Sequence, residues 1–195
     1  LDHADNVGSG GTADVMEVIR EVHKQELENV AVAVVWDPVA VKMMQEAGLG
    51  NRVSIDLGGK TDMPSIGRSG EVFHVEGRVA SLTDGIWTVE GPMYTGVEVS
   101  TGPTAVLDIG RIRIVVVSFH HEPWDSGIFS NNGINPTECR YLLLKSRIHY
   151  RAGFQPIARA TIRCDGHGVT TSRNDQLGYQ AIRRPIYPLD DDATA

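Results

Sequence analysis

The chain has 195 residues, of which 41% are hydrophobic and 22% are charged, and its formal net charge is -7. This length and composition suit one globular domain, or one domain with an added lobe. The acidic balance argues against a nucleic-acid-binding protein, because phosphate contacts require clustered Lys and Arg. No apolar run reaches the roughly 20 residues of a membrane span. We expect no membrane association and a cytoplasmic protein with two reduced cysteines.

The first eleven residues combine acidic side chains with a glycine-rich turn. Asp2, His3, Asp5 and Asn6 precede the sequence Gly8-Ser9-Gly10-Gly11, and a helix is predicted over residues 12–27 with Thr12 as its N-cap. Free N–H groups and the positive end of a helix dipole meet at such a turn. We therefore expect either a loop that lines a substrate cleft or a purely structural turn. The turn lacks the Gly-Lys-Ser/Thr ending of a phosphate-binding loop.

The next elements alternate between strand and helix at both ends of the chain. The run 30–36 predicts a buried strand, Pro38 begins a helix that Gly48 ends, and the run 141–144 predicts a second buried strand. We expect a helix over 148–154, a further strand over 157–164 and a disordered tail over 191–195.

The middle of the chain, about residues 52–119, is rich in short β runs separated by turn signals such as Asp84-Gly85. The predicted strands are 53–57, 72–82, 86–90, 97–99, 104–109 and 112–119. This segment is large enough to form a curved sheet or lobe of its own. The predicted fold class is therefore α/β (mixed α+β), with strand–helix units at both ends flanking a β-rich insertion in one domain over residues 1–190.

Two histidine-containing segments are candidate metal sites, and each could instead be a purely structural turn or loop. Three ligands within four residues seldom converge on one ion, so a minor contribution from His3 or Asp5 is the most that we expect. His120 and His121 are adjacent on a predicted strand and point to opposite faces, so they do not suit a shared ion. The alternative to a metal site is that the segment 120–125 is simply a strand end that runs into a loop.

Two lysines are candidate substrate-binding residues. Lys60 follows a glycine turn that suits either a carboxylate ligand or a solvated loop. Lys145 ends a predicted strand, which is the edge at which open α/β sheets bind ligands, and Ser146 suits a helix N-cap. Lys145 and His149 would then share a solvent-connected cleft with the Asp5-Asn6 loop. The alternative is that Lys145 forms an internal ion pair, while His149 packs against neighbouring side chains or caps a helix.

Several short motifs resemble the C-terminal domain of the MlrC family, named for microcystinase C. The matching motifs occur in order along nearly the whole chain: Asp5-Asn6-Val7-Gly8, Trp36-Asp37-Pro38, Gly58-Gly59-Lys60-Thr61-Asp62, Gly91-Pro92-Met93-Tyr94, Gly102-Pro103-Thr104-Ala105-Val106, Lys145-Ser146, His149-Tyr150-Arg151-Ala152 and Arg184-Pro185-Ile186-Tyr187-Pro188-Leu189-Asp190.

The resemblance implies a zinc-dependent peptidase or related amide hydrolase, such as one that degrades microcystin. It also implies that the metal ligands lie in an N-terminal domain outside this chain. The expected partners are that domain and a peptide or small amide substrate, and homo-oligomerisation is left open. The chain alone would be inactive and would hold no stoichiometric zinc.

Within that family role, the site residues divide into two groups. We expect catalytic contributions from Asp5, Asn6 and His149, and substrate contacts from Lys145, Gly8 and Lys60. Because Asp5 and Asn6 occupy a polar loop, their truncation is expected to affect turnover more than folding. The alternative function is a non-catalytic ligand-binding or oligomerisation domain of a multidomain protein.

Overall fold

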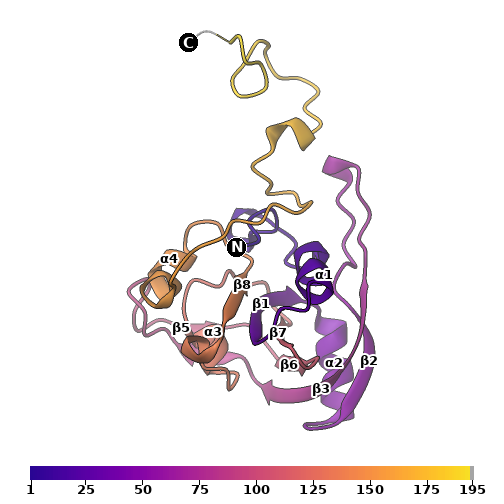
Figure 1. Ribbon diagram of the computed structural model, residues 1–195, viewed down its shortest axis with the longest axis vertical. Helices are drawn as coiled ribbons and strands as arrows, with labels where there is room; N and C mark the ends of the chain where they lie inside the picture. Colours follow the sequence, from indigo (N-terminus) through magenta and orange to yellow (C-terminus); the bar gives the residue numbers. More distant parts are fainter. Residues whose placement is uncertain (194–195) are drawn as a thin grey trace.

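The computed structural model describes residues 1–193 and is built on a six-stranded mixed sheet of order β2-β3-β6-β7-β1-β8 (Figure 1). Its strands are β1 (Val30–Trp36), β2 (Arg52–Leu57), β3 (Phe73–Thr83), β6 (Thr104–Asp108), β7 (Ile112–Val117) and β8 (Tyr141–Leu144). A separate two-stranded sheet pairs β4 (Ile86–Thr88) with β5 (Glu98–Ser100). The predicted mixed α/β fold class is confirmed.

The sequence predicted that the β-rich middle of the chain could form a sheet or lobe of its own, but this segment joins the main sheet. It supplies β2, β3, β6 and β7 to the same sheet as β1 and β8, and only the short β4–β5 pair stands apart. The reason is a non-local pairing, in which β7 lies parallel to β1 with Val30 opposite Ile112. Such pairings between distant segments leave no signal in local sequence patterns.

Helices cover both faces of the sheet, and each face has its own apolar core (Figure 1). On one face lie α1 (Glu17–Lys24) and α2 (Pro38–Ala47), and on the other lie α3 (Gly127–Ser130) and α4 (Tyr150–Phe154). From Val30 to Ala33 the residues of β1 serve the two cores alternately, with Val32 on the α1–α2 side and Ala31 on the α3–α4 side. This burial on both faces explains the continuous apolar run of β1.

Two local predictions are wrong, for identifiable reasons. The first helix begins at Glu17 and not near Thr12, because Asp5 accepts hydrogen bonds from the Ala13 and Val15 amides and holds this segment as a loop. No strand forms over residues 157–164, where only an isolated bridge joins Asp2 to Cys164. Of the tail predicted to be disordered (191–195), residues 194–195 lie outside the described residues.

Three parallel strands, β1, β7 and β8, end at the same edge of the sheet. Open α/β sheets bind ligands at the carboxyl ends of their strands. The segments that follow Val117 and Leu144 begin at this edge. The N-terminal segment also crosses it, because the Trp36 amide at the end of β1 donates a hydrogen bond to the Ala13 carbonyl. Within residues 1–193 no helix has the length and apolar character that a membrane span requires.

Candidate functional site

A fully enclosed ion cluster ties the N-terminal segment to the end of β8. The Lys145 ammonium nitrogen lies 2.9 Å from Asp2 Oδ2 and 2.9 Å from Asp5 Oδ2, and it donates to the Val15 carbonyl at 2.5 Å. Lys145 is 0% exposed. Burial alone would lower the pKa of Lys145, but the two carboxylates outweigh burial and raise it. For Asp2, burial outweighs the attraction of Lys145 and raises the pKa of the carboxyl group.

The prediction that Lys145 reaches a solvent-connected cleft is therefore wrong. The structure shows the alternative, in which Lys145 forms an internal ion pair. The apolar run of β8 carries Lys145 to the strand end, but the segment that holds Asp2 and Asp5 closes over it. A buried ammonium group needs such partners, because its desolvation without them would cost several kcal/mol.

Asp5 anchors the loop that follows it. Its Oδ1 accepts hydrogen bonds from the Ala13 amide at 2.8 Å and the Thr12 hydroxyl at 3.1 Å, and its Oδ2 accepts one from the Val15 amide at 3.0 Å. Asp5 is 0% exposed. These contacts argue against the expectation that truncating Asp5 would spare stability, because the variant would leave Lys145 and the Ala13 and Val15 amides short of partners.

Asn6 and Gly8 shape the turn above the strand ends. Asn6 Oδ1 accepts from the Gly8 amide at 3.1 Å and its Nδ2 donates to the Ser9 hydroxyl at 2.9 Å, so Asn6 caps the short 3₁₀ helix Val7–Ser9. A Cβ atom at Gly8 would lie only 1.9 Å from Glu122 Oε2. Glycine at this position thus lets the loop lie directly against the Glu122 carboxylate.

Glu122 and His149 form a hydrogen-bonded pair between the segments after β7 and β8. Glu122 Oε2 lies 2.8 Å from His149 Nδ1, and Glu122 Oε1 accepts a hydrogen bond of 2.6 Å from the Ser146 hydroxyl. The Glu122 side chain is 5% exposed, whereas the His149 side chain is 48% exposed. Ser146 also accepts from the Tyr150 amide at 3.2 Å, but α4 begins at Tyr150 with His149 as its N-cap, so the prediction that Ser146 is the N-cap is wrong. A buried carboxylate that orients an accessible imidazole is the arrangement expected of a proton-transferring histidine.

Glu122 was missed as a site residue by the sequence analysis, which treated its segment as a strand end. Glu122 and His149 are 27 positions apart and meet only because β7 and β8 both flank β1. Neither spacing nor residue type within either segment indicates this contact.

The other histidines near this edge are engaged elsewhere. The His3 ring nitrogen lies 3.2 Å from Asp165, and the exposed His120 stacks on Trp36 with ring centroids 4.3 Å apart. His121 is buried against the rings of Trp87 and Trp124, and this burial lowers its pKa to about 4, although Asp125 opposes the shift. Within residues 1–193, no three His, Cys, Asp or Glu side chains gather as a metal site.

Lys60 belongs to a second anchored loop. Its ammonium nitrogen lies 2.7 Å from Asp37 Oδ2, and its side chain remains 35% exposed. Asp37 also caps α2 through the Ala40 amide, while Asp14 Oδ2 accepts from the amides of Lys60 and Thr61 at 2.9 Å each. Of the two candidate lysines, Lys60 is the one with an accessible side chain.

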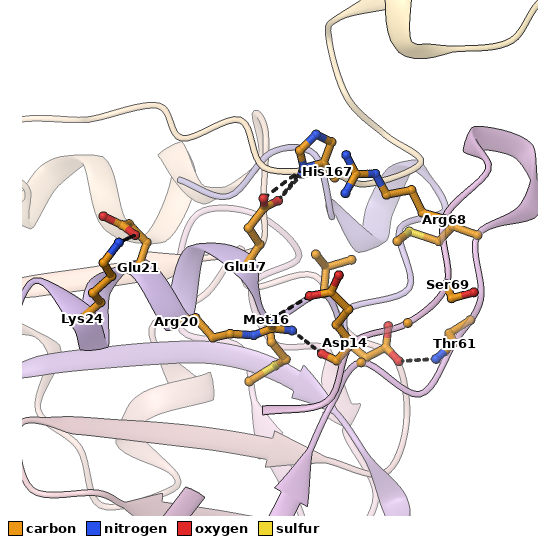
Figure 2. Close-up of a pocket in the computed structure, with 15 residues that line it drawn as sticks. Asp14, Met16, Glu17, Arg20, Glu21, Lys24, Thr61, Arg68, Ser69 and His167 are labelled. Atoms are coloured by element: carbon orange, nitrogen blue, oxygen red, sulfur yellow. Dashed lines mark hydrogen bonds and ion pairs between the residues drawn. The ribbon is translucent and has the colours of Figure 1, made fainter. Parts of the chain in front are cut away.

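Figure 2 shows a pocket of about 390 Å³ that adjoins this second loop. It lies between the start of α1 and the connection from β2 to β3, and its charged lining is largely paired, Glu17 with His167 and Arg20 with Glu71. A larger pocket of about 840 Å³ lies beside β8 and is lined by apolar side chains such as Val22, Phe154 and Ile162. None of the six predicted site residues lines either pocket.

The family model described as "MlrC C-terminus" matches residues 1–181. The chain belongs to the MlrC C-terminal family. This domain is 26% identical to "Microcystinase C" of Sphingomonas sp over 190 residues, which are 97% of the chain and 35% of that protein. The crystal structure named "Putative metallopeptidase" from Mesorhizobium sp. BNC1 has a TM-score of 0.83 and 26% identity, and the match covers 100% of this chain and 38% of that one. The MlrC C-terminal domain thus spans little more than a third of either relative.

We predict that replacing Lys145 by Met destabilises the domain by about 3–5 kcal/mol, because Asp2 and Asp5 would remain buried without a counter-charge. The matched control is Lys60→Met, which should cost less because the buried Asp37 carboxylate keeps two backbone amide donors and the Lys60 side chain is itself 35% exposed. Urea denaturation of both variants measures the difference. Equal losses in the two variants would contradict the enclosed cluster.

His121 makes a separate prediction about pH. Since burial lowers its folded pKa to about 4, the unfolded chain binds the proton first as pH falls below the ordinary value of 6.5. Stability should therefore fall between about pH 7 and pH 5, with His121 contributing about 2 kcal/mol of this loss. In His121→Phe, which keeps a ring between Trp87 and Trp124, that contribution should disappear. Parallel stability–pH curves for the two proteins would show that His121 is not the cause.

Proposed function

We propose that this chain is the C-terminal domain of a zinc-dependent peptidase or amide hydrolase that acts in the cytoplasm, and that it closes the active-site cleft and positions the substrate. Family membership over residues 1–181 and the names of the two relatives support a metallopeptidase as the parent protein. The observation within this chain that carries the proposal is the half-exposed His149, held by a buried carboxylate at the carboxyl ends of parallel strands.

The metal of such an enzyme would be held by residues outside this chain. In the described part of the chain, His3 and His149 are each engaged with one carboxylate, and no third ligand-type side chain joins either pair. The donor set therefore does not fit a catalytic zinc, which usually has three protein ligands. We derive no catalytic step through the metal from these residues.

The predicted site residues then divide by accessibility. His149 would contact the substrate or a water molecule, and the partly exposed Lys60 would attract a substrate carboxylate. Asp5 and Lys145 would act as positioning residues that hold the loop of Asn6 and Gly8 in place. Precise placement of such groups is worth several kcal/mol of activation free energy.

The C-terminal arm supports the remainder of the parent protein as a partner. The gold and yellow end of the chain extends away from the sheet (Figure 1) and carries exposed Tyr179, Ile182, Ile186 and Tyr187. An ion pair shapes its tip, since Arg184 Nε donates to Asp190 Oδ2 at 2.6 Å and the Ile186 amide donates to the same oxygen at 2.7 Å. We propose that these apolar side chains pack against the N-terminal domain, because exposed apolar clusters mark interaction sites.

The apolar pocket beside β8 favours one alternative, a non-catalytic domain that binds a small apolar ligand. The two functions differ in what they require of His149, which does not line that pocket. A purely ligand-binding domain would tolerate loss of the imidazole.

We predict that His149→Ala in the intact parent protein lowers kcat/KM for peptide amide hydrolysis by about 100-fold or more, the usual effect of removing a proton-transferring group. The melting temperature should barely change, because the His149 side chain is half exposed. The matched control is His74→Ala, since His74 also pairs with a carboxylate, Asp56, but on the exposed surface of β3.

Two further measurements test whether the parent protein depends on zinc and where the zinc ligands lie. Chelation should abolish the activity of the intact protein and zinc should restore it, while the dialysed chain alone should carry far less than one zinc per molecule. Full activity in His149→Ala would refute the proposed role and favour the ligand-binding alternative. One tightly held zinc per isolated chain would refute the placement of the ligands elsewhere.

A further inference from the structure

The hydrogen-bond pattern around Glu122 determines where the hydrogen of the His149 ring must be. Ser146 accepts from the Tyr150 amide through its oxygen, so its hydroxyl hydrogen is free to bond Glu122 Oε1 at 2.6 Å. Glu122 Oε2 then faces His149 Nδ1 at 2.8 Å. A carboxylate can only accept hydrogen bonds, so the hydrogen of this second bond belongs to Nδ1.

We propose that Glu122 holds His149 in the Nδ1–H tautomer, so that the Nε2 lone pair is the acceptor that the domain presents to substrate or water. The proposal rests on the proposed function, in which His149 faces the substrate. His149 would then act as a base: a proton lost by a bound water or by a substrate N–H or O–H ends on Nε2. Neutral His149 would have no hydrogen on Nε2 to donate to a developing oxyanion.

The surroundings of Glu122 make it suitable as a positioning residue. Its side chain is 5% exposed, and the turn at Gly8 lies against Oε2 so closely that a Cβ there would be 1.9 Å away. The turn therefore shields the carboxylate from water, and a shielded charge interacts more strongly with the ring N–H. When His149 takes up a proton, the imidazolium lies 2.8 Å from the Glu122 carboxylate, which stabilises the new positive charge.

The direct test is the tautomer of His149 in the chain itself. Long-range proton–nitrogen NMR spectra of the labelled chain would be recorded at about pH 8.5, where an ordinary imidazole is neutral. The His149 signals would be assigned by their loss in His149→Gln. We expect the Nδ1–H pattern in the wild type, and a shift towards the Nε2–H pattern in Glu122→Gln, whose side-chain amide can donate to Nδ1. His74 serves as an internal control, because its partner Asp56 is unchanged.

An Nε2–H pattern for His149 in the wild type, or no change of tautomer in Glu122→Gln, would overturn the proposal. Because Glu122 is buried, Gly8→Ala is a second variant that displaces the carboxylate without removing it, and it should also weaken the preference for Nδ1–H. An unchanged preference in Gly8→Ala would count against the shielding role of the turn.

Activity of the intact protein separates this inference from the proposed function. Glu122→Gln should lower kcat at least about tenfold with little change in KM, since Glu122 acts through His149 and does not touch the substrate. If the tautomer is as expected but His149→Ala is fully active, the proposed function fails and the tautomer assignment stands. If His149 is essential but carries its hydrogen on Nε2, the function stands and the inference fails.

Discussion

The arrangement at the carboxyl ends of the strands depends on one buried cation. Lys145, delivered by β8, pairs with the carboxylates of both Asp2 and Asp5 without access to water. Removing one partner from such a cluster leaves uncompensated buried charge, so the three side chains hold their places together or not at all. Through Asp5 the cluster also fixes the amides of Ala13 and Val15, and with them the path of the glycine turn over the sheet edge.

This constraint separates the residues that build the site from those that are available to act in it. The enclosed ion cluster and the capping contacts of Asn6 set the course of the turn, and Gly8 brings that turn against Glu122. Glu122 in turn contacts His149, whose side chain remains half exposed. A rigid inner layer supporting one accessible group is the arrangement expected where proton transfer requires precise geometry.

The sequence was informative wherever local pattern decides structure, and silent where distant segments meet. The apolar run of β1, the helix between Pro38 and Gly48 and the short strands of the middle segment were predicted closely, because their periodicity and turn residues are local. The late start of α1 was not predictable, since it depends on Asp5 bonding the amides of the following loop. The ion pair of Lys145 with Asp2 and the contact of Glu122 with His149 likewise join segments that are distant in the sequence. The sequence therefore indicated that candidate residues would gather at one edge of the sheet, but it did not indicate which of them would be buried.

Native-state hydrogen exchange of the Ala13 and Val15 amides tests whether the buried cluster holds the glycine loop on the sheet edge. Both donate to Asp5 within the buried cluster, so they should exchange as slowly as the amides of β1 although they belong to a loop. In Lys145→Met they should lose protection before the amides of β1 do. If the two amides exchange in the wild type as fast as those of an exposed turn, the cluster does not hold the glycine loop on the sheet edge.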